Sequence, residues 1–342
     1  MTATATATRP AIRVRHLWHR FGNHDVLRDV SFDVAEGEIF GFIGPNGAGK
    51  TTTIRVMSTL LEPMAGRVEI DGYDVTIDPD KVRKVIGYMP DHAGVYDRIS
   101  VREYLEFFAD AYRVPTAGTT YAVVDAVMEL TDLVKLHDKL VATMSKGMKQ
   151  RLQLARVLLH DPKVLILDEP ASDLDPRARI EMRDLLVELR GMGKTIFLSS
   201  HILTELADVC TSVAILERGR LVVSGPITDI ARRLTATQNA ASDAAATPGE
   251  ASEALAPPTR SVKLKVLAPS EAVSAQLAAV PFVLRVTPGS HGTAVVVFSG
   301  DDGSVAEIVR ALVLSGIPVC GVEPERNELE RIFLEVTKGE LQ

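Results

Sequence analysis

A glycine-rich segment at residues 44–51 has the residue types and spacing needed to hold phosphate groups. It reads Gly-Pro-Asn-Gly-Ala-Gly-Lys-Thr and fits G-x-x-x-x-G-K-[ST], a pattern whose small residues let backbone amides surround a phosphate. An apolar stretch precedes it and a helical pattern follows, which disfavours a chance glycine-rich turn. Lys50 is expected to reach the terminal phosphates and the Thr51 hydroxyl to hold Mg²⁺. The phosphate-binding set is Gly44, Asn46, Gly47, Gly49, Lys50, Thr51 and Thr52.

Two adjacent carboxylates follow a second apolar run further along the chain. Asp168 and Glu169 come directly after Val164–Leu167. A carboxylate at the end of such a strand can hold Mg²⁺, directly or through water, and the next one can polarise an attacking water. Taken alone, the pair could be a solvated strand end. Together with the phosphate loop, it indicates a site for nucleotide hydrolysis.

The elements that must position these residues alternate between strand and helix patterns from about residue 11 to 234. Strands are predicted at 38–44, 67–71, 85–89, 164–167, 195–199 and 213–217, with a further short strand after the turn at Gly219. Helices are predicted at 50–60, 101–112, 121–130, 149–159, 177–190 and 202–209. Apolar strands separated by helices are typical of an α/β fold whose sheet is covered on both faces.

The composition changes after this region. Residues 235–260 are rich in Ala, Ser, Thr, Pro and Glu, and we interpret them as a flexible linker; their prolines disfavour the alternative, an Ala-rich helix. Residues 261–342 follow the order βαββαβ with a final helix at 327–338, which indicates a small α+β ferredoxin-like domain. Residues 1–10, an alternating Thr/Ala stretch, are interpreted as a disordered tail.

Composition excludes several classes of protein. The 342 residues suggest about two domains, and the net charge of −7 counts against a nucleic-acid binder. Two cysteines cannot build a disulfide framework or a four-cysteine metal site. No run approaches the roughly 20 apolar residues of a membrane-spanning helix, and the N-terminus does not match a signal peptide. The sequence therefore predicts a cytoplasmic chain that reaches a membrane only through another protein.

Four further segments surround the two motifs. Phe21 lies in Arg-Phe-Gly ahead of the phosphate loop, and residues 144–148 read Met-Ser-Lys-Gly-Met before a predicted helix. Residues 171–175 read Ala-Ser-Asp-Leu-Asp, and His201 follows the next predicted strand. In this order, the motifs resemble those of the ATP-binding subunits of ABC transporters over roughly residues 11–234. The resemblance implies a P-loop NTPase (ABC ATPase) domain with a helical subdomain, and ATP and Mg²⁺ as cofactors.

The resemblance also implies roles for individual residues. Phe21 is the aromatic on which adenine stacks, with ordinary core packing as the alternative. Two subunits enclose two ATP molecules, so that Ser145 and Gly147 bind the γ-phosphate held by the opposite subunit. Asp175 belongs to the loop that crosses the dimer seam. His201 contacts the γ-phosphate, and the catalytic set is Glu169, His201 and Lys50.

Two positions depart from the family pattern. The usual Leu-Ser-Gly-Gly-Gln is Met-Ser-Lys-Gly-Met here, which adds Lys146 near the phosphates. Asp91 stands where the family has a Gln that touches Mg²⁺. Asp91 is shorter and charged, and it is interpreted either as a metal ligand, with Thr51 and Asp168, or as a loop cap. Both variants are typical of exporters of drugs, lipids or polysaccharides that have separate membrane subunits.

The predicted function is therefore an ATPase subunit that energises an ABC exporter by ATP-driven dimer closure. Its expected partners are integral membrane permease subunits and a second ATPase subunit, most simply an identical copy, at the inner face of the cell membrane. The aromatic residues Tyr96, Tyr104, Phe107 and Phe108 fit either core packing or a groove for a permease helix. The alternative functions are a soluble ABC ATPase with a non-transport target and a nucleotide-dependent regulator with low turnover.

Overall fold

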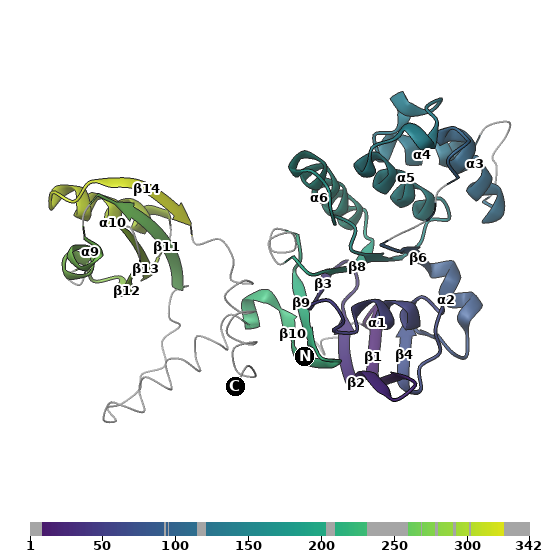
Figure 1. The fold of residues 1–342 in the computed structure, drawn as a ribbon, viewed down its shortest axis with the longest axis horizontal. Helices are drawn as coiled ribbons and strands as arrows, with labels where there is room; N and C mark the ends of the chain where they lie inside the picture. The colour runs from purple at the N-terminus through teal and green to yellow at the C-terminus, as the bar shows by residue number, and fades with distance from the viewer. Residues whose placement is uncertain are drawn as a thin grey trace, which may run out of the picture. The chain divides into compact units, whose positions relative to one another are not determined.

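The computed structural model describes residues 9–91, 94, 96–114, 121–202, 209–230, 259–267, 269–277, 280–289, 292–300 and 302–324. These residues form two compact units, one within 9–230 and one within 259–324 (Figure 1). Most of the predicted tail, most of the predicted linker, the helix predicted at 327–338 and most of the helix predicted at 202–209 lie outside the described residues.

The first unit is built on a six-stranded sheet with the order β10-β9-β3-β8-β7-β6. Its strands are β3 (Ile39–Ile43), β6 (Ile86–Met89), β7 (Val164–Asp168), β8 (Thr195–Ser200), β9 (Ser212–Glu217) and β10 (Arg220–Pro226). Neighbours from β9 to β6 are parallel, while β10 is antiparallel to β9. Every residue of β3, β7 and β8 is buried, which explains why the sequence shows them as nearly continuous apolar runs.

A second, antiparallel sheet of the same unit has the order β2-β1-β4-β5. Its strands are β1 (Ile12–Phe21), β2 (His24–Val34), β4 (Ala65–Ile70) and β5 (Tyr73–Asp74). α1 (Lys50–Met57) lies between the two sheets (Figure 1) and shares one buried cluster with both. Within this cluster, the ring of Phe32 stacks on those of Phe40 and Phe197, with centroids 5.5 and 5.9 Å away.

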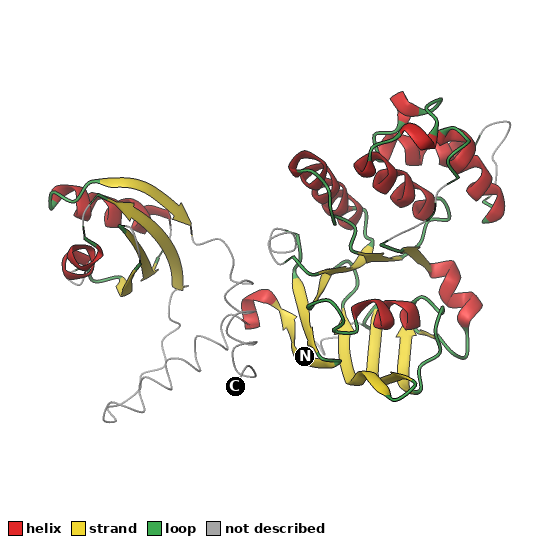
Figure 2. Cartoon of the chain, viewed as in Figure 1, coloured by secondary structure: helices red, strands yellow, loops and turns green. Residues whose placement is uncertain are grey.

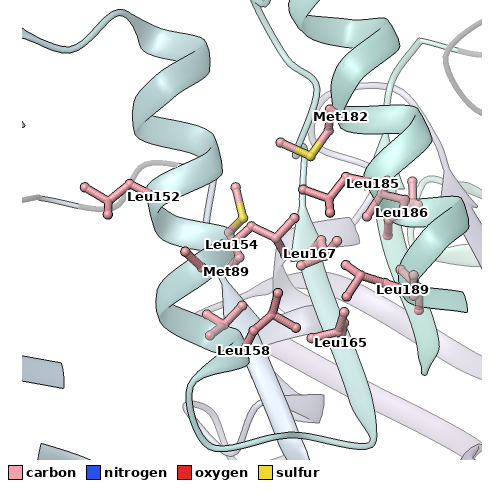
Figure 3. Close-up of a cluster of buried hydrophobic side chains, with 14 of the residues drawn as sticks. Met89, Leu152, Leu154, Leu158, Leu165, Leu167, Met182, Leu185, Leu186 and Leu189 are labelled. Carbon is pink, nitrogen blue, oxygen red and sulfur yellow. The ribbon is translucent and has the colours of Figure 1, made fainter. Parts of the chain in front are cut away.

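Five further α-helices in the described part of the chain pack around these sheets in the first unit. They are α2 (Pro79–Val85), α3 (Val101–Ala111), α4 (Ala122–Leu130), α5 (Lys146–Leu158) and α6 (Pro176–Gly191). Leucine and methionine side chains of α5 and α6 meet those of β7 in a continuous core (Figure 3). The core includes Leu154 and Leu158 of α5, Leu165 and Leu167 of β7, and Met182, Leu185 and Leu189 of α6. This packing fixes the first turns of α5 and α6 relative to the end of β7.

The second unit is a four-stranded antiparallel sheet with two helices. Its elements are β11 (Thr259–Val266), α9 (Ser270–Leu277), β12 (Val283–Pro288), β13 (Thr293–Ser299), α10 (Asp302–Leu314) and β14 (Val319–Pro324). The strand order is β12-β13-β11-β14, and α9 and α10 pack against the sheet (Figure 2). Burial alternates along β13, with Ala294, Val296 and Phe298 in the core. The elements follow the predicted order βαββαβ.

His160, just after α5, is partly buried against β6. Its Nε2 lies 2.8 Å from the carbonyl oxygen of Ile86, and its ring centroid lies 4.6 Å from that of Tyr112. Burial lowers the pKa of His160 below its ordinary value of 6.5, although the hydrogen bond with Ile86 and the charge of Asp161 oppose this shift. Because the unfolded chain then takes up this proton at a higher pH than the folded chain, protonation favours unfolding as the pH falls below 6.5.

We therefore expect His160→Gln to weaken the loss of stability of the first unit between about pH 7.5 and pH 5.5. Glutamine keeps a donor for Ile86 but does not titrate. Denaturant unfolding followed by the fluorescence of Trp18, the single tryptophan of the sequence, measures the effect. Ile86→Val, which keeps the backbone acceptor of His160 and removes no titrating group, is the matched control and should retain the wild-type pH dependence. Identical pH dependence in all three proteins would contradict the prediction.

Candidate active site

The phosphate loop connects β3 to α1, and its glycines are required for two different reasons. Gly47 and Gly49 have φ values of 82° and 110°, a region that residues with a Cβ rarely adopt. Gly44 has no such φ, but a Cβ there would lie 2.4 Å from the carbonyl oxygen of Leu216. The left-handed glycines agree with the tight loop that the glycine spacing predicted, whereas the close approach of Gly44 to Leu216 was not predicted.

The turn between β9 and β10 is hydrogen-bonded to the phosphate loop. The backbone N–H of Gly219 donates to the carbonyl oxygen of Ala48 at 3.0 Å, and the carbonyl oxygen of Gly219 accepts from the N–H of Arg28 at 2.7 Å. Gly219 has a φ of 78°, and a Cβ there would lie 2.3 Å from the carbonyl oxygen of Val26. This turn joins the phosphate loop to β2 through backbone hydrogen bonds that do not depend on a ligand.

Lys50 is a buried cation, 6% exposed, at the start of α1. Its Nζ donates to the carbonyl oxygens of Gly44 at 2.7 Å and Pro45 at 3.4 Å. The same atom lies 3.5 Å from Oε1 of Glu169. The ammonium is thus held over the loop that would surround a phosphate, next to the carboxylate predicted to act on water.

Asp168 ends β7 as a buried carboxylate, only 2% exposed. The Ser199 hydroxyl, on β8, donates to its Oδ1 at 2.6 Å. Burial raises the pKa of Asp168, as do the negative charges of Asp91 and Glu169, while hydrogen bonds with Ser199 and Thr51 lower it. A carboxylate in this setting gains strongly from a nearby cation, because the cation offsets the cost of its burial.

Glu169 has a left-handed backbone, with a φ of 52°. This conformation costs a non-glycine residue about 1 kcal/mol and is found where the surrounding structure demands it. Here the Glu169 N–H donates to Ser199 Oγ at 3.1 Å, and its Oε2 lies 2.6 Å from Nδ1 of His201. The strained backbone therefore places the carboxylate between His201 and Lys50, where it can accept a proton from water.

These side chains meet at a cavity of about 510 Å³. The predicted residues that line it are Asn46, Gly47, Gly49, Lys50, Thr51, Thr52, Asp91, Glu169 and His201. Gly44 and Asp168 do not line it, but each is hydrogen-bonded to a residue that does. Pro45 lies within the predicted motif, whereas His24, Val26 and Ser172 were not predicted. For His24 and Val26, the only signal in the sequence was their closeness to Phe21.

Phe21 ends β1 and does not line the cavity. Its side chain is 50% exposed, so the alternative of ordinary core packing is wrong. Its ring meets that of His19 edge-on, with centroids 4.7 Å apart. Phe21 pairs with His24 across the β1–β2 turn, and His24 does line the cavity. The aromatic ring therefore belongs to the residue paired with one that lines the cavity, and its role in stacking on adenine stays a prediction.

Ser145, Gly147 and Asp175 lie away from the cavity, at the first turns of α5 and α6. Ser145 Oγ accepts from the Met148 N–H at 3.3 Å, and Asp175 Oδ1 accepts from the Ala178 N–H at 2.9 Å. Both side chains thus cap their helices. A Cβ on Gly147 would lie 3.0 Å from that of Ala178, so the two helix starts are in contact. The structure groups these three residues with one another and not with Lys50.

Comparison with known proteins decides the family. A family model described as "ABC transporter" matches residues 27–172. A daunorubicin resistance ATP-binding protein of Streptomyces coeruleorubidus is 39% identical over 63% of this chain and 68% of its own length. A Nod factor export ATP-binding protein of Burkholderia lata is 37% identical over 63% of this chain and 70% of its own. The chain belongs to the ABC transporter ATP-binding subunits.

A solved structure agrees with this assignment. The structure of an ATP-binding subunit of an ABC transporter, 33% identical, superposes with a TM-score of 0.58 and covers 66% of this chain and 93% of its own. The fold of this ABC subunit is thus the predicted P-loop NTPase fold, and the cavity at the phosphate loop is its candidate ATP site. In the part of the chain that the structure describes, no helix has both the length and the apolar character to cross a membrane.

Proposed function

We propose that this ABC subunit hydrolyses ATP to energise an exporter through separate membrane permease subunits. The observation that carries the proposal is the meeting of Lys50, Glu169 and His201 at one cavity beside the phosphate loop. The names of the two relatives, which refer to daunorubicin resistance and Nod factor export, support export as the direction of transport.

The residues at the base of the cavity fit a bound magnesium ion. The Thr51 hydroxyl and the buried Asp168 carboxylate are oxygen ligands of the type that Mg²⁺ prefers, and Asp91 lines the same cavity. We propose Thr51 and Asp168 as its holders, with Asp91 as a further oxygen ligand in place of the family's Gln. Mg²⁺ would neutralise charge on the phosphate oxygens.

The remaining steps fall to side chains of the chain itself. Amides of the phosphate loop and the Lys50 ammonium would bind and orient the phosphates, because Gly47, Gly49 and Lys50 all line the cavity and both kinds of group donate hydrogen bonds to phosphate oxygens. Glu169 would orient the attacking water and accept its proton. His201, which contacts Glu169, would hold that carboxylate in place and donate toward the terminal phosphate.

A second subunit would complete the site. Ser145, Gly147 and Asp175 are absent from the cavity of their own chain, which supports the proposal that they serve the ATP of a partner. One chain carries both the phosphate loop and the Ser145 segment, so two identical copies could form two equivalent sites. We therefore propose a homodimer that closes on ATP and reopens after hydrolysis.

The aromatic residues before and within α3 divide into two groups. Tyr104 is fully buried, which favours core packing for that residue. Tyr96 and Phe107 are 57% and 50% exposed, and their rings meet edge-on with centroids 5.5 Å apart. We propose this exposed pair as part of the permease contact, because neighbouring exposed aromatic rings are typical of interaction surfaces.

The proposed domain organisation keeps all but one of the boundaries predicted from the sequence. The predicted boundaries are an ATPase domain at 11–234, a linker at 235–260 and an accessory α+β domain at 261–342. The last boundary moves by two residues, because β11 of the accessory domain begins at Thr259. We propose that the assembled subunit sits on the inner face of the membrane through the permease and does not bind nucleic acid. No observation favours either of the two alternative functions.

A tagged pull-down from detergent-solubilised membranes of the native host tests this function. We expect recovery of a polytopic membrane protein with about two ATPase chains per transporter. A Tyr96→Ser/Phe107→Ser variant should lose this partner but keep ATP binding. Recovery of soluble partners alone, with the tagged chain absent from membranes, would refute the exporter function.

A further inference from the structure

The first turn of α5 carries two lysines and no acidic residue. Lys146 and Lys149 lie where the helix dipole is positive, and cations there are unfavourable. Acidic residues are the favourable choice in this turn. The arrangement therefore needs negative charge from outside the helix.

Carboxylates from two other segments supply this charge. Lys146 Nζ lies 2.8 Å from Oδ2 of Asp173, in the loop between β7 and α6. Lys149 Nζ lies 3.5 Å from Oδ1 of Asp97, ahead of α3. The first pair is the shorter, and it connects Lys146, next to Ser145, with the loop that begins at Glu169.

The Lys146–Asp173 ion pair is weak enough for Lys146 to leave Asp173 for another anion. The two side chains are 45% and 76% exposed, so solvent screens their attraction and the pair contributes little to stability. Asp173 has a φ of 55°, a conformation that Asp and Asn tolerate better than most residues. A phosphate carries more negative charge than one carboxylate and accepts stronger hydrogen bonds from an ammonium.

We propose that Lys146 is a phosphate-binding residue that Asp173 holds until the γ-phosphate of a second subunit reaches Ser145, when Lys146 transfers to that phosphate. This inference rests on the proposed function, because the phosphate comes from the partner's ATP. Asp173 and the phosphate then compete for one ammonium. Asp173 thereby raises the ATP concentration at which the dimer closes, and Lys146 lowers it.

The test measures ATP-dependent dimer formation of the full-length chain by analytical ultracentrifugation in the Glu169→Gln background. Asp173→Asn should lower the half-maximal ATP concentration about threefold, and Lys146→Gln should raise it about threefold or more. Lys146→Arg should keep the half-maximal ATP concentration within about twofold of that of the parent protein, since Arg keeps the charge. In the Lys146→Gln background, Asp173→Asn should change the value by less than about 1.5-fold, because the competition is gone.

Asp71→Asn is the matched control. It breaks another exposed 2.8 Å pair of the first unit, with Lys163, and should leave the half-maximal ATP concentration unchanged. Shifts of Asp173→Asn and Lys146→Gln in the same direction would indicate a structural role and overturn the inference, as would no shift in either. If the parent Glu169→Gln protein binds ATP but does not dimerise, the proposed function itself fails.

Discussion

Glu169→Gln is expected to reduce ATP turnover by about 100-fold or more while leaving ATP binding intact. Glutamine keeps the shape of the side chain but cannot accept a proton from water. The phosphate loop and Lys50 are unchanged, so the nucleotide should still bind. Because hydrolysis is the step that reopens the dimer in the proposed cycle, the variant should also accumulate as an ATP-bound dimer. Steady-state phosphate release, ATP binding and sedimentation measure the three effects.

Glu181→Gln is the matched control for Glu169→Gln. It removes a carboxylate that pairs with Arg151 and Arg177, outside the cavity, and should leave turnover near the wild-type rate. Wild-type turnover in Glu169→Gln would show that another group activates the water. Loss of ATP binding would show instead that the 3.5 Å contact between Glu169 and Lys50 is needed to form the phosphate site.

Ser145→Ala is expected to lower turnover by about 100-fold without preventing ATP from binding to the same chain's phosphate loop. Ser145 does not line the cavity of its own chain, and in the proposed dimer its hydroxyl acts on the nucleotide of the other subunit. The substitution also removes the N-cap of α5, which costs about 1 kcal/mol of stability. ATP binding and hydrolysis by the same preparation separate the two effects.

Ser100→Ala is the matched control, because it removes a helix cap without removing a proposed phosphate contact. Ser100 caps α3 as Ser145 caps α5, and the Ser100 N–H also donates to Oε2 of Glu103 at 2.7 Å. Its removal should lower stability by a similar amount and leave turnover unaffected. Equal loss of turnover in both variants would point to destabilisation, and loss of ATP binding in Ser145→Ala would exclude the two-subunit arrangement.

The sequence predicted the strands that are apolar along their whole length and the long amphipathic helices. It did not predict two strands with one partly exposed face or the shortest helices. The buried parallel strands, such as β7 and β8, stand out because helices or a second sheet cover both faces. β1 and β2 were not predicted as strands, although apolar side chains alternate with polar ones along both. Each has one face against the core and one partly exposed, so neither forms a long apolar run. α2 is too short for helical periodicity to be visible.

In the site, too, residues that are contiguous in the sequence were predicted, whereas contacts between residues far apart in the sequence were not. Residues 44–52 are contiguous, so a pattern could predict them together. The contact of His201 with Glu169 depends on the order of β7 and β8. The resemblance to a family assigned both residues to the site but did not predict that they touch each other. His24 and Val26 reach the cavity through the β1–β2 hairpin, which was not predicted. The ion pair of Lys146 with Asp173 joins residues 27 positions apart and has no signal in either motif.

The turn at Gly219 affects how much of the free energy of ATP binding is spent on ordering the phosphate loop. Its backbone bonds to Ala48 and Arg28 join the phosphate loop to β2 and favour one conformation of the loop. A preorganised loop loses little conformational entropy when phosphate arrives. The amide of Gly219 should accordingly exchange its hydrogen slowly in the nucleotide-free protein, and ATP should change that rate little. The free energy of nucleotide binding then remains available for drawing two subunits together.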